Sequence, residues 1–249
     1  MPKGSALLVL CVVCVCLTLS GCKDGGTWLF SRDDEVKLGT DAAAEFEKTN
    51  KISADAALAR FVAGVGASVA AAATPPDYPY KFKVIDTTDV NAVAFPGGPV
   101  YVYRGLLEKT SMDRDMIAWV LGHEVSHIAL QHAAKRIENQ VGVELITQTL
   151  LGKGSAAQVA GLISGLMFQD YGRDKELQAD HQGLLYAAKA GYDPTAAIGV
   201  IQVFQSLSGG KDPNKLELLF MSHPGDNTRI NQIKSLCAKY GYRGKYYKP

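Results

Sequence analysis

Two histidines flank a glutamate in the segment His123-Glu124-Val125-Ser126-His127. On a helix, residues four positions apart share one face, so both imidazoles can reach one ion with bonds of about 2.0–2.1 Å. Zinc lowers the pKa of a coordinated water toward about 7, and the carboxylate of Glu124 can take its proton. The spacing therefore predicts a hydrolytic metal site with His123 and His127 as ligands and Glu124 as general base.

The residues around this segment are strongly apolar, both at 116–121 and at 128–130. Ionisable side chains inside such a helix are costly to bury unless they bind something. This context favours a metal site over a half-buried polar helix face.

A catalytic zinc ion needs a third protein ligand. The downstream candidates are His132, Glu176, Asp180, His181 and His223. His132 is five residues past His127, so it is expected to point well off the ligand face. Glu176 and Asp180 are again four residues apart, so one can bind zinc while the other accepts a hydrogen bond from a ligand imidazole. A solvated acidic helix face is the alternative interpretation of this pair.

Four segments, taken in order, resemble the Ste/HtpX-type zinc metallopeptidases of peptidase family M48, particularly their exported BepA- and LoiP-like branch. Residues 91–98 with 100–102 resemble the family's N-A-x-A-x-P-G-G strand pair, and residues 123–127 its H-E-x-x-H motif. Residues 176–180 resemble E-x-x-A-D, and residues 222–230 resemble S-x-H-P…R-I. The resemblance spans roughly residues 35–235.

The resemblance implies that His123, His127 and Glu176 bind one zinc ion per chain, with Glu124 as the base. It also implies that Asp180 accepts a hydrogen bond from a ligand imidazole. The implied fold is α+β and mainly α-helical, a zincin-like domain with a small sheet and an active-site helix that carries HExxH. The implied reaction is hydrolysis of peptide bonds in polypeptide substrates.

Hydrolysis also requires a group that stabilises the oxyanion. The candidates are His223, Arg229, Arg173 and Tyr171, which the sequence does not rank. His223 has a second possible role as a gate, because glycines flank it at 209–210 and at 225. It could fill the open zinc position and hold the enzyme latent. His181 is expected to have no role.

The first residues have the pattern of a lipoprotein leader. Lys3 precedes an apolar run of 14 residues at 6–19, which is short for a membrane span and ends at Leu19-Ser20-Gly21-Cys22. We expect a signal peptide at 1–21, lipidation at Cys22, a tether at 22–31 and one domain at 32–249. The alternative is an uncleaved anchor helix. Lys23, in place of Asp, favours the outer membrane for an exported, lipid-anchored protein on the periplasmic face.

Charge is nearly balanced, with 26 basic and 25 acidic residues, which gives no indication of a nucleic-acid partner. Of five cysteines, three lie in the leader and one is Cys22, so Cys237 has no partner for an internal disulfide. The expected partners are polypeptide substrates and a membrane, reached through the lipid on Cys22. The oligomeric state is not indicated.

Local patterns predict the elements around these motifs. Ser31, Ser53 and Ser111 are the expected N-caps of helices at 32–48, 53–73 and 112–136. Strands are expected at 79–86, 91–95 and 99–103, with Pro99 at an edge or a strand start. Further helices are expected as a pair within 138–169, either buried or apposed to a membrane, and at 173–190, 194–207 and 227–239.

Two functions of different classes follow. The first is a zinc-dependent endopeptidase that acts on misfolded or unassembled cell-envelope proteins. The second is a non-proteolytic zinc-bearing chaperone or assembly lipoprotein of the envelope, because the same groove could bind unfolded chains without cutting them. A purely structural zinc site is disfavoured, since such sites are usually rich in cysteine.

Overall fold

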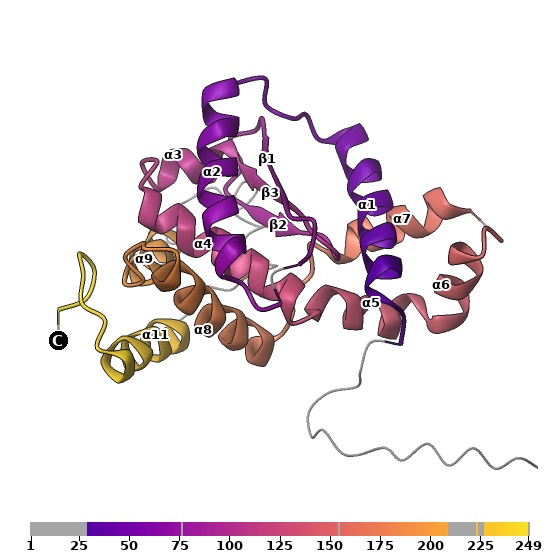
Figure 1. Ribbon diagram of the computed structural model, residues 1–249. Coiled ribbons are helices and arrows are strands. Elements are labelled where there is room, and N and C mark those ends of the chain that lie inside the picture. Colours follow the sequence, from indigo (N-terminus) through magenta and orange to yellow (C-terminus); the bar gives the residue numbers. More distant parts are fainter. Residues whose placement is uncertain (1–28, 76, 154, 209–222, 224–226, 249) are drawn as a thin grey trace, which may run out of the picture.

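The computed structural model describes residues 29–75, 77–153, 155–208, 223 and 227–248 (Figure 1). The expected leader at 1–21 and lipidation site at Cys22 lie outside these residues. The described chain is mainly helical with one small sheet, which confirms the α+β fold class. Within the described ranges, no helix combines the length and the apolar character needed to cross a membrane.

The sheet has three strands in the order β1-β3-β2, formed by β1 (Lys81–Ile85), β2 (Ala92–Ala94) and β3 (Pro99–Tyr103). β1 runs parallel to β3, and β2 runs antiparallel to it. Pro99 is the first residue of β3, so the missing N–H lies at a strand start as expected. Gly97 has a φ of 72°, which suits the tight turn between β2 and β3.

Alternate residues of the strands enter two separate cores. Val84, Val100 and Val102 pack against helices α2 (Ala56–Ala72) and α4 (Arg114–Ala129). Tyr101 and Tyr103 face the second core, formed with α1 (Arg32–Thr49), α5 (His132–Val141) and α7 (Ala156–Leu166). Successive side chains of a strand point to opposite faces, so this sheet divides the molecule into the two cores. Figure 1 shows α1 and α7 side by side at the second core.

Helix α4 carries the HExxH segment and is buried on all sides from Met116 to Ile128. Its N-cap is Asp113, whose side chain accepts hydrogen bonds from the backbone N–H groups of residues 115 and 116. The expectation that Ser111 caps this helix is wrong. Ser111 has a φ of 51° and belongs to the turn before the helix, where its backbone N–H bonds the carbonyl of Glu108.

The predicted single helix at 112–136 is in fact two helices, α4 and α5. Gln131 separates them in the left-handed conformation, with φ 56° and ψ 32°, which an α-helix cannot continue through. The Gln131 side chain donates a hydrogen bond to Glu35 of α1 at 2.9 Å. This tertiary contact stabilises a break that the helical pattern of the sequence does not reveal.

At the other predicted helix starts, Ser31 forms a capping box with Asp34 and begins α1 as expected. Asp55, not Ser53, caps α2, since its side chain accepts from the N–H groups of Ala57 and Leu58. The segment at 138–169 contains the end of α5 and then the expected pair of helices, α6 (Val143–Leu150) and α7.

The remaining helices are α3 (Arg104–Lys109), α8 (Arg173–Lys189), α9 (Ala196–Ser208) and α11 (Asn227–Tyr240). α8 crosses α4 at very close range. A Cβ atom on Gly122 would lie 2.8 Å from the carbonyl oxygen of Gly183, and one on Gly183 would lie 2.7 Å from the backbone nitrogen of His123. Only glycine permits this approach, which brings the acidic residues of α8 beside the histidines of α4.

Candidate metal centre

Four buried side chains converge where α4 crosses α8. They are His123 and His127 from α4, Glu176 from α8, and His223, and each offers one ligand atom within 4.8 Å of the others. All four are candidate metal ligands from the sequence. The crossing brings Glu176 to the histidine pair, 49 residues beyond His127 in the chain.

The donor atoms have the spacing that zinc requires. Nε2 of His123 lies 3.1 Å from Nε2 of His127 and 3.2 Å from Nδ1 of His223. The Glu176 carboxylate lies 3.4 Å from Nε2 of His127 and 3.0 Å from Nδ1 of His223. A tetrahedral ion with bonds of about 2.0–2.1 Å separates its donor atoms by about 3.3–3.4 Å. The four residues therefore fit a zinc ion.

The protons on these rings also favour a cation. Nδ1 of His123 lies 3.0 Å from Oδ1 of Asp180, and a carboxylate only accepts, so Nδ1 carries the proton of the neutral ring. Nε2 of His123 then presents a lone pair to the histidines and the glutamate around it. Lone pairs that converge in a buried space are unfavourable unless a proton or a metal ion lies among them.

Without a metal, a proton stabilises this arrangement. Burial lowers the pKa of His123, but the hydrogen bonds to Asp180 and Glu176 raise it more, to about 9. Burial raises the pKa of Glu176, yet the nearby His223 and His123 hold it well below its ordinary value. Burial takes the pKa of His127 well below that of a free imidazole. Zinc binding must displace the proton that His123 holds.

Asp180 links the ligand group to Arg229 of α11. Nε of Arg229 donates to Oδ2 of Asp180 at 2.7 Å, and Nη2 donates to Oδ1 at 2.5 Å. Nη1 of Arg229 lies 3.3 Å from Oε2 of Glu176. Burial raises the pKa of Asp180, but the charge of Arg229 and the hydrogen bonds from His123 and Arg229 lower it by more, so the pKa lies below its ordinary value. Asp180 thus accepts a hydrogen bond from His123, while Arg229 contacts both carboxylates.

Tyr171 contacts the site through its ring. The ring stacks on His127, with centroids 4.2 Å apart and planes 27° apart, and the Arg136 guanidinium lies 3.8 Å from the Tyr171 centroid. The Tyr171 hydroxyl contacts Sδ of Met167 at 3.9 Å. These contacts favour a role in holding His127 over the predicted role in stabilising an oxyanion.

His132 is not among the four grouped donors, as expected for a residue off the ligand face. It nevertheless contacts His127 on the other side of the ring, where the two Nδ1 atoms are 3.0 Å apart. The break at Gln131 allows this contact, which the spacing of the residues does not reveal. Burial lowers the pKa of His132 to about 4, so its ring is neutral. His181, by contrast, lies outside the candidate metal group and forms a hydrogen bond of 2.9 Å with the Tyr240 hydroxyl.

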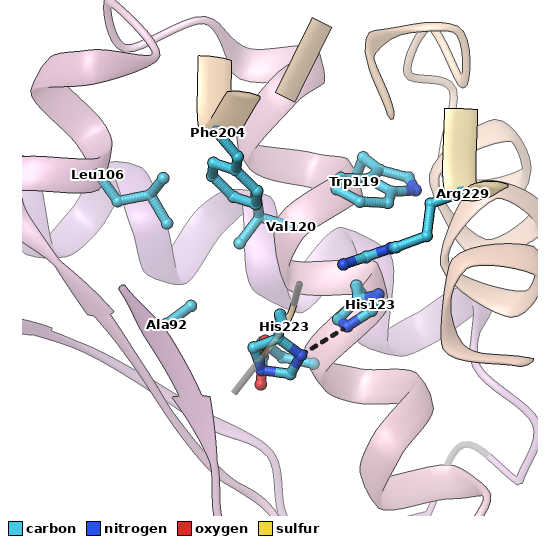
Figure 2. A pocket seen from close by; sticks show the side chains of 9 residues that line it. Ala92, Leu106, Trp119, Val120, His123, Phe204, His223 and Arg229 are labelled. Atoms are coloured by element: carbon cyan, nitrogen blue, oxygen red, sulfur yellow. Dashed lines mark hydrogen bonds and ion pairs between the residues drawn. The ribbon is translucent and has the colours of Figure 1, made fainter. Parts of the chain in front are cut away.

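An apolar pocket opens beside the metal group. Besides Glu124, its lining includes Ala92, Leu106, Trp119, Val120, His123, Phe204, His223 and Arg229. Figure 2 shows Leu106, Val120 and Phe204 gathered on one side and His123 and His223 at the other end. The pocket thus joins β2 of the sheet to His123 and His223 of the candidate metal group. Such a space can hold an apolar side chain next to a reacting bond.

Comparison with known proteins agrees with this geometry. Residues 56–237 match peptidase family M48. Metalloprotease YcaL of Escherichia coli is 27% identical over 216 residues, which cover 82% of this chain and 80% of the relative. The beta-barrel assembly-enhancing protease of Yersinia pestis is 26% identical over 82% of this chain. The mitochondrial metalloendopeptidase OMA1 of Arabidopsis thaliana is 33% identical over 52% of it.

The latter two relatives are longer proteins, of which the matched part is 44% and 27%. The matched range contains the HExxH helix, Glu176 and His223, so the family assignment and the metal group concern the same residues. The chain belongs to peptidase family M48 and is a zinc-dependent metalloendopeptidase.

Proposed function

We propose that this chain cleaves polypeptides of the cell envelope, with His123, His127 and Glu176 as its zinc ligands and Glu124 as its general base. The observation that carries the proposal is the spacing of 3.0–3.4 Å among the buried donor atoms. Bound zinc would act there as a Lewis acid that polarises the scissile carbonyl and makes the attacking water more acidic.

In this proposal Glu124 transfers protons and does not bind the metal. It is 3% exposed, and Oε1 lies 3.5 Å from Nε2 of His223, on the side of that ring away from the donor atom Nδ1. In the proposed reaction its carboxylate takes a proton from the attacking water and delivers it to the leaving amine.

His223 is proposed to hold the enzyme latent. A catalytic zinc site keeps one position open for water or substrate. Nδ1 of His223 lies 3.0 Å from Glu176 and 3.2 Å from His123, which is the place of a fourth donor. Substrate access therefore requires the His223 ring to move away from this position. Arg229 is the other residue proposed to stabilise the oxyanion.

The sheet supports a polypeptide substrate. β2 is an edge strand in the order β1-β3-β2, and Ala92 of β2 lines the pocket beside His123. An extended substrate can pair with such an edge through main-chain hydrogen bonds, which tolerate many sequences. The apolar pocket would then receive one of its side chains.

The envelope location rests on the leader and on one group of relatives. We propose a signal peptide at 1–21, a lipid on Cys22, a tether at 22–31 and a catalytic domain at 32–249, on the periplasmic face of the outer membrane. Relatives named beta-barrel assembly-enhancing protease support an envelope role. The names of the relatives favour proteolysis, and nothing favours the alternative, a non-proteolytic assembly factor.

The test combines metal analysis with digestion of casein by the wild-type chain and Glu124→Gln. We expect one zinc ion per chain in both proteins and proteolysis only in the wild type. A Cys22→Ser variant, compared for incorporation of radiolabelled palmitate, tests the anchor separately. A zinc-loaded His223→Ala variant that cleaves no polypeptide would support the assembly-factor alternative.

A further inference from the structure

We infer that His132 holds His127 in the orientation and tautomer that zinc binding requires, within a hydrogen-bonded chain that ends at Gln178. The inference rests on the proposed role of His127 as a zinc ligand. It adds a positioning residue that lies outside the HExxH and E-x-x-A-D segments.

The contacts form a continuous line from the metal group to the surface. Nδ1 of His127 lies 3.0 Å from Nδ1 of His132, and Nε2 of His132 lies 3.1 Å from Oε1 of Gln178. The two rings are steeply inclined, with an interplanar angle of 73°. His127 is 0% exposed and His132 is 4% exposed, whereas Gln178 is exposed on α8.

The direction of each hydrogen bond can be assigned from the exposed end. Oε1 of Gln178 also lies 3.4 Å from Nζ of Lys175, and an ammonium group only donates, so the amide atom there is the oxygen. That oxygen accepts from Nε2–H of His132. An imidazole that carries its proton on Nε2 presents a lone pair on Nδ1, so Nδ1 of His132 accepts a hydrogen bond from Nδ1–H of His127.

This assignment leaves the lone pair of His127 on Nε2, the atom that faces His123 and Glu176. A ligand histidine usually donates its second N–H to a carboxylate, a carbonyl or water, and that bond sets its tautomer. His123 follows this pattern through Asp180, whereas His127 donates to a second imidazole. The two zinc-binding histidines are thus held by acceptors of different charge.

The break at Gln131 makes this contact possible. On a continuous helix, a residue five positions after His127 lies about 140° around the axis from it. The left-handed Gln131 turns the chain between the two histidines, and α5 then begins at His132 itself. The bond from Gln131 to Glu35 therefore supports the zinc ligand indirectly.

A direct test is nitrogen-15 NMR of the imidazoles in the zinc-loaded protein. We expect the proton of His132 on Nε2, the proton of His127 on Nδ1, and a scalar coupling across the N–H···N bond between their Nδ1 atoms. A His132 ring protonated on Nδ1, or the absence of this coupling, would overturn the inference.

Zinc affinity, measured by competition with a chelator, gives a second test. We expect His132→Leu to weaken zinc binding by about 10–100-fold. Gln178→Leu changes only an exposed residue, so it avoids the risk of misfolding, and it should weaken binding less but measurably. Gln178→Glu keeps an acceptor and should bind zinc at least as tightly as the wild type. Gln158→Leu, on the exposed face of α7, is the matched control and should have no effect.

Two failures can be told apart. If His127→Ala keeps wild-type zinc affinity, the proposed ligand set is wrong. If His127→Ala loses zinc but both His132→Leu and Gln178→Leu bind it as the wild type does, the ligand set stands and the role of His132 is wrong.

Discussion

Arg229 of α11 donates two hydrogen bonds to Asp180 of α8, at 2.7 Å and 2.5 Å, in a fully buried pair. Asp180 in turn accepts from the imidazole of His123 at 3.0 Å. Helix α11 is thereby tied to His123, a proposed zinc ligand, through one carboxylate. Bidentate geometry of this kind fixes orientation as well as charge.

Removing the guanidinium of Arg229 should lower the stability of the fold. Arg229→Met leaves the buried charge of Asp180 without its cation, and we expect a loss of about 3–5 kcal/mol in the free energy of unfolding. Chemical denaturation of the metal-free protein measures it. Arg32→Met, which removes an exposed ion pair with Asp77, is the control and should cost less than about 1 kcal/mol. Equal losses in both variants would show that burial of the ion pair does not decide its contribution to stability.

Glu124→Gln should separate metal binding from catalysis. The amide cannot accept the proton of the attacking water, so we expect kcat to fall by about 10²–10⁴-fold or more. Zinc content should stay at the wild-type level, because Glu124 is not among the grouped donor atoms. Peptide hydrolysis and metal analysis on the same samples check this. A parallel loss of zinc would mean that Glu124 serves as a ligand.

His223→Ala tests latency. If the ring fills the fourth zinc position, its removal should raise the activity of the purified enzyme toward casein while zinc remains bound by the other three residues. X-ray absorption at the zinc edge should show one nitrogen ligand fewer. Unchanged zinc coordination together with unchanged proteolysis would reject the gate. Gln202→Ala, at an exposed position of α9, serves as the control.

Zinc binding should release protons. The metal-free His123 has a pKa of about 9, so near pH 7.5 its ring is charged and must lose about one proton to zinc. Calorimetric titration in buffers of different ionisation enthalpy measures this number. Asp180→Asn, which removes the charge of one partner that raises the pKa, should release less. Proton release that is the same in both proteins would contradict the assignment.

The His123 imidazole also makes the stability of the metal-free protein depend on pH. The folded pKa of about 9 lies above the ordinary value of 6.5, so protonated His123 stabilises the metal-free fold. This contribution is complete below about pH 6.5 and is lost as the pH rises through about 9. Zinc-loaded protein should lack it, which a comparison of thermal unfolding with and without a chelator tests.

The close crossing of α4 and α8 should tolerate no side chain. Gly183→Ala places a methyl group 2.7 Å from the backbone of His123, and we expect a destabilisation of about 1–3 kcal/mol with weaker zinc binding. Gly161→Ala in α7 meets no atom within 4 Å and should stabilise by about 0.5–1 kcal/mol. Similar effects of the two substitutions would show that the crossing does not position the ligands.

By itself, the sequence determined the parts of the site that depend on local geometry. His123 and His127 share a face because they are four residues apart on one helix, and the same holds for Glu176 and Asp180. The resemblance to known peptidases then joined these two segments. Local patterns likewise predicted the three strands, and Pro99 lies at a strand start as expected.

Only the tertiary structure decided which distant residues meet. The predicted helix at 112–136 was wrong because a bond from Gln131 to α1, 96 residues away, stabilises a break that no local pattern encodes. That break brings His132 to His127, and the path of the chain brings His223 to His123 across 100 residues. Helical spacing is set within a few residues, but contacts over such separations exist only once the whole core has packed.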